Sequence, residues 1–472
     1  MNASPAAFAR PRRRDARISG RAWILALGIA LVLGLAAGAN AGLAAAGVIG
    51  VALVAVLLAN LTAGLMVFIV IAFLESLSTV QGGPSLAKLF GLFLVVGWAL
   101  AVAFGRPGEH SSRDFVSSAP ALVWPLMLFL AWVVFSFLWA EDAGVAQETF
   151  LRYALNFGLF PIVFAAIREQ RHVVWLYAVF VAGGLITSAV GVLSPRAAGG
   201  NVGERLGGVG VNPNELGGLA ATAAVMAAVL TCNRGLSAPA RVTALVASFL
   251  SAISMIMTET RGAVVGLAAA MVAAPLLAGP RRRLAAMGVV SVALLSLVLW
   301  LSAFAPRSAV DRLTHFGSSG TGRSDLWTIG LRMVDDKPVT GVGAGNFPVS
   351  SIHYLIQPGA IVRDEFIVDV PKETHNIYLQ VLAELGIVGL ALFLAIVAYC
   401  IASALRAARA FRRAGAEAME LMARGIILAL IALLGASAFT TELYSKQLYL
   451  LLAVGPALLA IARRQVRQGA IR

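Results

Sequence analysis

Charged residues are scarce in this chain. They make up 13% of its 472 residues, compared with about 25% in an average soluble domain. Hydrophobic residues make up 59%, and apolar runs of about 18 residues or more recur along the chain, each long enough to cross a bilayer. This composition excludes a soluble globular protein and predicts an all-α membrane protein. The alternating ten-residue segments of a transmembrane β-barrel are absent from the sequence.

Cysteine is also scarce. The two cysteines, Cys232 and Cys400, are far apart and have no C-x-x-C spacing, which excludes a zinc or dithiol redox motif. The sequence contains no H-E-x-x-H, Walker A, G-x-S-x-G or D-x-D motif either. We therefore predict no metal site and no cofactor.

The charge that is present is mostly positive, with a formal net charge of +14. In a soluble protein this excess would suggest a nucleic-acid partner, but here the arginines fall in short loops between apolar runs, as the positive-inside rule expects. We predict no nucleic-acid partner and place both termini in the cytoplasm. The arginines that then lie on the cytoplasmic side, outside the N-terminal tail, are Arg106, Arg113, Arg168, Arg171, Arg234, Arg241, Arg281, Arg282, Arg283, Arg406, Arg409, Arg412, Arg413, Arg463, Arg464, Arg467 and Arg472.

The apolar runs predict an all-α polytopic membrane protein with about 12–14 transmembrane helices and one long periplasmic loop that contains short helices. The predicted spans are 22–38, 42–59, 62–80, 86–104, 119–139, 153–167, 173–193, 215–232, 242–259, 262–279, 284–304, 376–403, 421–439 and 444–462. The predicted parts of the chain are a basic cytoplasmic tail (1–21), an N-terminal transmembrane bundle (22–304), a periplasmic loop (305–374), C-terminal transmembrane helices (375–462) and a second basic tail (463–472).

Inside the long loop, residues 324–334 are predicted to form a short amphipathic helix. Ser324 is suited to cap its start. Trp327, Leu331 and Val334 share one face, which suits either a helix in the membrane interface or a helix packed on the protein's own span ends.

A glycine-rich segment, 341–348, follows this helix. It lacks the strand, the helix and the third glycine of a dinucleotide-binding fingerprint. We predict a tight turn, and we keep open that its successive backbone N–H groups cradle an anion.

Two arginines lie on the side of the membrane that the positive-inside rule keeps poor in positive charge. Arg205 is in the predicted outer loop 194–214, and Arg261 is at a tight outer turn. Positive charge there opposes the predicted topology, which suggests a function. The alternative is a snorkelling side chain or a loop ion pair, with Glu204 or Glu259.

His375 opens a long apolar run directly after the longest polar loop. Histidine takes up and releases a proton near neutral pH, and several arginines on the same side suit the pyrophosphate of a lipid head group. Arg323, in the long loop, adds to Arg205 and Arg261 on that side. One base and several cations suit a transfer reaction, in which the base helps a hydroxyl attack and the cations stabilise the departing phosphate.

The ordered motifs between about residues 200 and 440 resemble those of the O-antigen ligase and polymerase superfamily. The motifs that carry this resemblance are Arg205 with 211–216 (VNPNEL), 260–262 (TRG), 322–327 (GRSDLW), 341–347 (GVGAGNF), 375–379 (HNIYL) and 384–386 (ELG). The first 200 residues match the superfamily only as apolar spans.

The resemblance implies a metal-independent, inverting glycosyltransferase with a GT-C-type helical fold in the bacterial inner membrane. Its donor would be a glycan on undecaprenyl pyrophosphate at the periplasmic face, and its acceptor lipid A–core or a growing polysaccharide. Carried over by position, Arg205 and Arg261 would bind the donor pyrophosphate. His375 would orient or deprotonate the acceptor hydroxyl. Arg323 would bind phosphate or fix the loop.

Three alternatives stay open at this point. Ligase and polymerase share these motifs, and transfer to a protein is a further variant. A transporter for a lipid-linked glycan would also fit many spans with scattered arginines, but it would be expected to show internal repeats and charged or broken helices at mid-membrane. A membrane scaffold would leave His375 and the arginines unexplained.

Overall fold

The computed structural model describes residues 60–75, 86–104, 112–193, 212–278, 283–284, 287–288, 322–355 and 372–467, all within one compact unit, Leu57–Arg472. Every regular element in these ranges is helical, so the predicted all-α class is confirmed. The helices are α3 (Leu61–Leu74), α4 (Leu86–Phe104), α5 (Ser112–Ser118), α6 (Pro120–Phe135), η2 (Ser136–Leu138), α7 (Ala143–Ala166), α8 (Gln170–Leu193), α9 (Pro213–Cys232), α10 (Ala238–Met257), α11 (Arg261–Leu277), α14 (Arg323–Asp336), α15 (Phe347–Ser350), η4 (Ser351–Tyr354), α16 (Ile377–Arg413), α17 (Glu417–Ala436) and α18 (Lys446–Arg467).

Eight stretches of the described chain are long and apolar enough to cross a membrane, which makes this a multi-pass membrane protein. They are Pro120–Leu138, Ala143–Ala166, Gln170–Val192, Pro213–Cys232, Ala238–Met257, Ile377–Arg413, Glu417–Ala436 and Lys446–Gln465. Leu61–Leu74, Phe90–Ala99 and Arg261–Leu277 are shorter apolar helices. The predicted spans 22–38 and 42–59 lie outside the described residues, and 284–304 lies almost wholly outside them. The predicted total of 12–14 helices therefore stays a prediction.

The predicted start of the span at residue 153 is wrong, because α7 begins ten residues earlier. The side chain of Asp142 caps α7 by accepting hydrogen bonds from the backbone N–H groups of Gly144 and Val145. Glu148 and Arg152 then pair one turn apart at 2.7 Å. These polar residues hid the first turns of the helix from a reading based on hydropathy alone.

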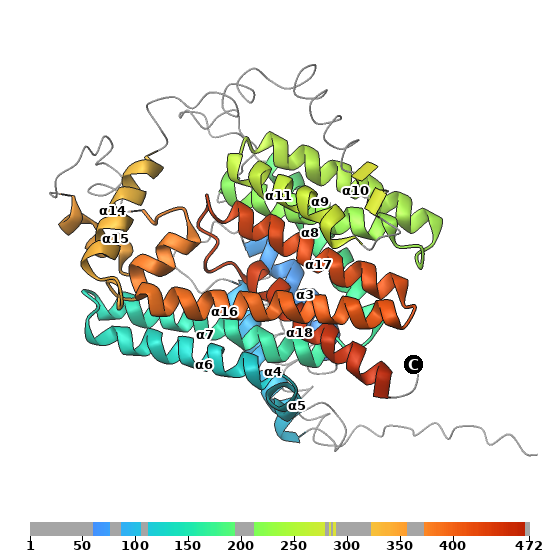
Figure 1. The fold of residues 1–472 in the computed structure, drawn as a ribbon, viewed down its shortest axis with the longest axis horizontal. Helices are drawn as coiled ribbons and strands as arrows, with labels where there is room; N and C mark the ends of the chain where they lie inside the picture. Colours follow the sequence, from blue (N-terminus) through green and yellow to red (C-terminus); the bar gives the residue numbers. More distant parts are fainter. Residues whose placement is uncertain are drawn as a thin grey trace, which may run out of the picture. The chain divides into compact units, whose positions relative to one another are not determined.

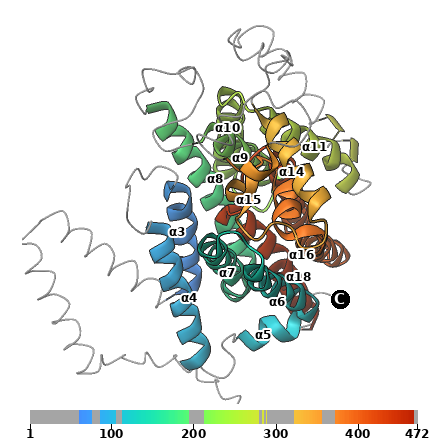
Figure 2. The same cartoon turned by 90° about the vertical axis from the view of Figure 1, so that its left-hand side faces the viewer.

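α9 lies at the centre of one half of the bundle, packed against α8, α10, α11 and α17. Figure 1 shows α9, α10 and α11 side by side, and Figure 2 shows α3 beside α4. Residues 233–237 and 258–260 connect α9, α10 and α11 in alternating directions. α9 and α11 therefore both start on one side of the bundle, which we call the Asn376 end because α16 starts there as well.

Two glycines let α11 dock closely against α17. A Cβ on Gly266 would lie 2.1 Å from the backbone oxygen of Ala432, and one on Gly262 would lie 3.0 Å from that of Ala436. The spacing is the G-x-x-x-G pattern by which membrane helices bring their backbones together. This contact fixes Arg261, the first residue of α11, beside the end of α17.

α16 is broken inside the apolar run that predicted a single span. Gly386 has φ 65° and ψ −169°, which removes it from the helix. The helical hydrogen bonds lost at the break are replaced by the segment 338–343. The N–H of Val342 donates to Ala383 (2.9 Å), the N–H of Gly343 donates to Glu384 (2.9 Å), and Pro338 accepts from the N–H of Ile387 (2.9 Å). The glycine-rich segment thus completes the backbone of α16.

Gly386→Ala is expected to destabilise the protein more than Gly415→Ala. Both glycines have similar positive φ, +65° and +69°. A Cβ at residue 386 would lie 2.0 Å from the backbone oxygen of Val339, whereas one at residue 415 meets nothing within 4 Å. Strained φ alone costs about 1–3 kcal/mol, and only residue 386 adds a clash. Thermal unfolding in detergent should show the larger loss for Gly386→Ala; equal melting temperatures would contradict this account of the break.

The predicted loop helix is present as α14, but its predicted cap is wrong. Gly322, with φ 71°, precedes the helix, and Ser324 lies inside it. The buried face carries Leu326, Ile329 and Met333, which form a small core with residues of the glycine-rich segment and α16. α14 therefore packs on the start of α16, but the predicted packing face of Trp327, Leu331 and Val334 is wrong, because Leu331 is on the exposed side.

Candidate functional site

Three of the four predicted site residues lie at the Asn376 end. Arg261 is the first residue of α11, Arg323 is the first residue of α14, and His375 is two residues before α16. Arg205 lies outside the described residues, so its predicted role is untested. Arg261 and Arg323 are therefore both at helix starts, where backbone N–H groups and the helix dipole also favour an anion.

A continuous set of contacts joins these three residues. The side chain of Phe439, which follows α17, lies against Gly262, next to Arg261. The Phe439 ring is 6.1 Å from the ring of Trp327 on α14. Trp327 Nε1 in turn donates to the backbone oxygen of Thr374 at 2.9 Å, immediately before His375. Residues from three distant segments are thereby held in one place.

The positive charges at this place act on one another. Burial lowers the pKa of Arg323, and the charge of Arg261 lowers it further. Within the ranges that the structure describes, no carboxylate forms an ion pair with Arg323. Two guanidinium groups that repel each other in a partly buried position are a favourable setting for a phosphate group, which each can grip with two hydrogen bonds.

The backbone around His375 is strained and firmly held. His375 has φ 53°, and Glu259 (φ 50°), two residues before Arg261, is the other non-glycine residue of the described chain with positive φ. Thr374 Oγ1 accepts from the N–H of Asn376 at 3.2 Å, and the Asn376 side chain caps α16. Strain of this kind persists where surrounding contacts enforce it, and it is concentrated at functional sites.

The imidazole of His375 is neutral at ordinary pH. Burial lowers its pKa from 6.5 to about 4, with further contributions from the positive charges of Arg323 and Lys372. Thr441 Oγ1 lies 2.8 Å from Nδ1 of the ring. A neutral imidazole has one nitrogen able to accept a proton, which is the state a general base requires.

Carboxylates lie near the same place. Burial raises the pKa of Glu373 to about 7; the charge of Arg152 opposes this shift and that of Glu215 adds to it. Burial raises the pKa of Glu442 well above its usual value, and Glu215 adds to the shift.

The glycine-rich segment does not offer its N–H groups to an anion, the alternative considered from sequence. Besides the two bonds to α16, the N–H of Ala344 donates to Ser136 Oγ (3.2 Å) and that of Gly345 to Glu384 Oε2 (2.9 Å). The N–H of Asn346 donates to the Gly343 backbone oxygen. The segment is a structural turn, and the buried carboxylate of Glu384 is one of its anchors.

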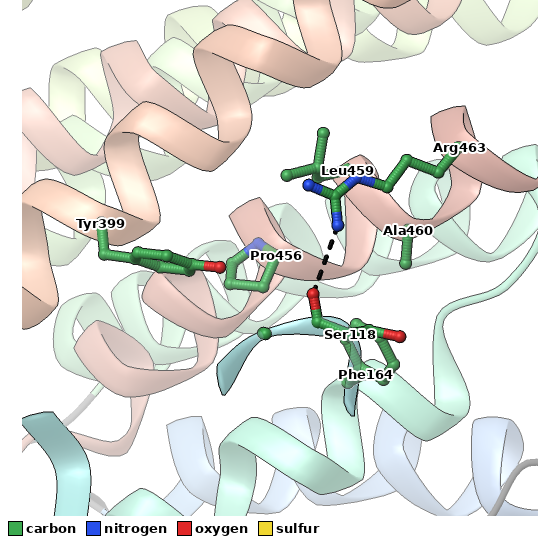
Figure 3. Close-up of a pocket in the computed structure, with 8 residues that line it drawn as sticks. Ser118, Phe164, Tyr399, Pro456, Leu459, Ala460 and Arg463 are labelled. Atoms are coloured by element: carbon green, nitrogen blue, oxygen red, sulfur yellow. Dashed lines mark hydrogen bonds between the residues drawn. The ribbon is translucent and has the colours of Figure 1, made fainter. Parts of the chain in front are cut away.

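Other features lie away from this place. Figure 3 shows a small hollow beside the last turns of α7 and α18, on the side of the bundle opposite the Asn376 end. There the Arg463 guanidinium donates to the Ser118 backbone oxygen (3.2 Å). Within the described ranges, no three histidine, cysteine, aspartate or glutamate side chains are placed to hold a metal ion. The predicted absence of a metal and a cofactor stays a prediction.

Several residues of the site were missed in the sequence. Arg152 lies on α7 with its guanidinium 5.4 Å from the Tyr444 ring centre. Thr441 follows α17 and reaches His375. The signal for Thr441 was a polar run, 440–442, between two apolar runs on the same side as His375. Its partner could not be identified without knowing how α16 and α17 pack.

The fold and the site define a polytopic helical membrane protein with a histidine and two arginines gathered at one end of its helices. Residues 246–394, which include Arg261, Arg323 and His375, match the family model described as O-antigen ligase. The chain carries an O-antigen ligase family region, and the predicted resemblance to that superfamily is confirmed over it. The family implies a glycosyltransferase-like activity of the ligase or polymerase type. A comparison with curated proteins found no match.

Proposed function

We propose that this chain is a bacterial inner-membrane glycosyltransferase. It transfers a glycan from undecaprenyl pyrophosphate to an acceptor hydroxyl, of lipid A–core or of a growing polysaccharide, at the periplasmic face. The observation that carries the proposal is the meeting of Arg261, Arg323 and His375 at one end of the bundle, inside the O-antigen ligase region. The family match supports the ligase or polymerase type, and the donor, acceptor and membrane face are part of the proposal.

The proposed reaction is an inverting displacement. His375 accepts the proton of the acceptor hydroxyl as its oxygen forms a bond to the anomeric carbon. The bond from that carbon to the pyrophosphate breaks, and undecaprenyl pyrophosphate leaves with the electron pair. Arg261 and Arg323 stabilise the negative charge that grows on the leaving group. Arg205 remains a proposed third phosphate ligand.

The donor would itself activate the base. In the free site, Arg323 and Lys372 help to lower the pKa of His375 to about 4. A bound pyrophosphate beside Arg323 would offset this positive charge and raise the His375 pKa toward the working pH, where a general base is most effective. Proton abstraction would then depend on donor binding.

The distribution of charge supports the proposed orientation. Many of the described arginines, such as Arg171, Arg241 and Arg412, lie on the side of the bundle opposite the Asn376 end. Under the positive-inside rule that side is cytoplasmic, which would place His375 at the periplasmic face.

The geometry favours transfer over transport. In a transporter, the arginines would be expected along a path through the membrane, next to broken helices at mid-membrane. Arg261 and Arg323 instead gather at one end. The backbone groups at the break in α16 form hydrogen bonds with the segment 338–343 and with Trp132, whose Nε1 donates to the Leu385 oxygen at 2.8 Å. The break is therefore not open to a transported substrate.

The test is the size of the glycan on undecaprenyl pyrophosphate in a strain of the parent bacterium that lacks this gene. Long polymer stranded on the lipid is expected for a ligase, and single repeat units are expected for a polymerase. Complementation with the wild-type gene should restore the normal pool, and complementation with a His375→Ala gene should not. A lipid-linked pool that is unchanged by the deletion would contradict both forms of the proposal.

A further inference from the structure

His375 meets a hydroxyl, where a general base more often meets a carboxylate. In the described part of the chain the hydrogen bond of its ring joins Nδ1 to Oγ1 of Thr441, at 2.8 Å. Glu442 is next in sequence, but its Oε1 lies 3.8 Å from the Cβ position of Gly218 and so is directed to α9. Thr441 is therefore the described residue that orients the ring.

We propose that Thr441 is a positioning residue for His375: its Oγ1 accepts the Nδ1–H of the ring, which leaves the lone pair on Nε2. The inference rests on the proposed function, because it concerns which nitrogen takes the proton of the acceptor hydroxyl.

Both partners of this hydrogen bond belong to the same rigid part of the structure. The N–H of Ile377 donates to the Ser437 oxygen (3.1 Å), and the Tyr378 hydroxyl donates to the Leu434 oxygen (3.0 Å), which ties the start of α16 to the end of α17. Thr440 Oγ1 donates to the Ala436 oxygen at 3.4 Å, at the base of the connection that carries Thr441. The distance between Thr441 and the ring is consequently fixed by packed helices.

The direction of this hydrogen bond decides whether Nε2 can act as a base. If the threonine hydroxyl donated to Nδ1, the single ring proton would sit on Nε2, and that nitrogen could not act as a base. If Oγ1 accepts from Nδ1–H, Nε2 has a free lone pair. When Nε2 then takes the acceptor's proton, the ring becomes positive and the bond to Oγ1 becomes charge-assisted and stronger. This arrangement contributes more in the transition state than in the resting site.

A threonine in this position also differs from a carboxylate in its effect on charge. A carboxylate would fix the tautomer and raise the basicity of the ring at all times. In the proposed arrangement threonine orients the ring without adding negative charge, so the ring stays a weak base until an anion binds near Arg323. Thr441 sets the orientation and the donor pyrophosphate sets the basicity.

The experiment compares Thr441→Val, Thr441→Ser and, as a matched control, Thr243→Val, because the Thr243 hydroxyl donates to the Pro239 oxygen at 3.0 Å on the exposed start of α10. Transfer is measured with the full chain in proteoliposomes that carry the lipid-linked glycan pool and the acceptor extracted from the parent bacterium. Thr441→Val should lower kcat by about 10²-fold, the size of a general-base contribution, with KM for the donor lipid unchanged. Thr441→Ser, which keeps the oxygen, should retain most of the activity, and Thr243→Val should behave as wild type.

The tautomer is read directly by nitrogen NMR of wild-type protein labelled on its five histidines, with the His375 signals assigned by their loss in His375→Ala. Wild type should show a protonated Nδ1. A protonated Nε2, or full activity of Thr441→Val, would overturn the proposal even if His375→Ala is inactive and the proposed function stands. An active His375→Ala would instead overturn the proposed function. Should Thr441→Val fail to fold, the wild-type tautomer and the serine variant still decide.

Discussion

Replacing His375 by alanine should abolish glycan transfer while the protein still inserts and folds. Loss of a general base lowers a rate by about 10²–10⁴-fold, which in a cell-based assay is no activity. The His375 ring contributes one described hydrogen bond, to Thr441, so the stability lost should be only about 1 kcal/mol. The measurement is transfer in proteoliposomes, with thermal unfolding in detergent recorded on the same preparation.

The control for this variant is His353→Ala. His353 also follows α14 in the chain, but its Nε2 pairs with Glu141 at 2.8 Å, on an exposed surface. This substitution should leave transfer near the wild-type rate. Full activity of His375→Ala, or equal losses in both variants, would remove the role assigned to His375.

Arg261→Lys is expected to lose most of the transfer activity although it keeps the charge. Lysine is a point charge without the planar fork that holds two oxygens of a phosphate group, so its contribution to the growing leaving-group charge falls. Loss of one charge-assisted hydrogen bond of about 1.5–3 kcal/mol corresponds to a rate loss of roughly 10–100-fold. The loss should appear in kcat/KM for the lipid-linked donor.

Arg171→Lys is the matched control, because Arg171 lies at the opposite end of the bundle and is paired with Glu169 at 2.7 Å on an exposed surface. It should have no effect on transfer. If Arg261→Lys is as active as wild type, phosphate binding by the planar fork is the wrong role for Arg261, and charge alone is what the site requires.

Some helix starts could be predicted from the sequence, although that of α7 could not. Asn376 and Asn212 are typical capping residues, and each caps the helix that follows, as their positions before apolar runs indicate. Pro213, at the first position of α9, strengthens that signal. The outer positions of His375 and Arg261 were predicted from the positive-inside rule and stay a prediction.

The meeting of the site residues could not be predicted in this way. Arg323 was a weaker candidate because a long loop does not obey the charge rule and its position depends on packing. It reaches the site through Trp327, which contacts Phe439 and Thr374, residues more than 45 positions away along the chain. Hydropathy and charge do not encode such contacts, and the break at Gly386 was hidden inside an apolar run for the same reason.

The segment between His375 and Gly386 has a fixed length for a geometric reason. Gly386 lies eleven positions after His375, which is about three helical turns. One end is tied to Ser437 through Ile377, and the other to the segment 338–343 through Ala383 and Glu384. Inserting or deleting one residue would rotate one end against the other by about 100°. Either the His375 ring would then lose its hydrogen bond to Thr441, or Ala383 and Glu384 would lose theirs to the segment 338–343. We therefore expect the insertion or deletion of one residue here to inactivate the protein.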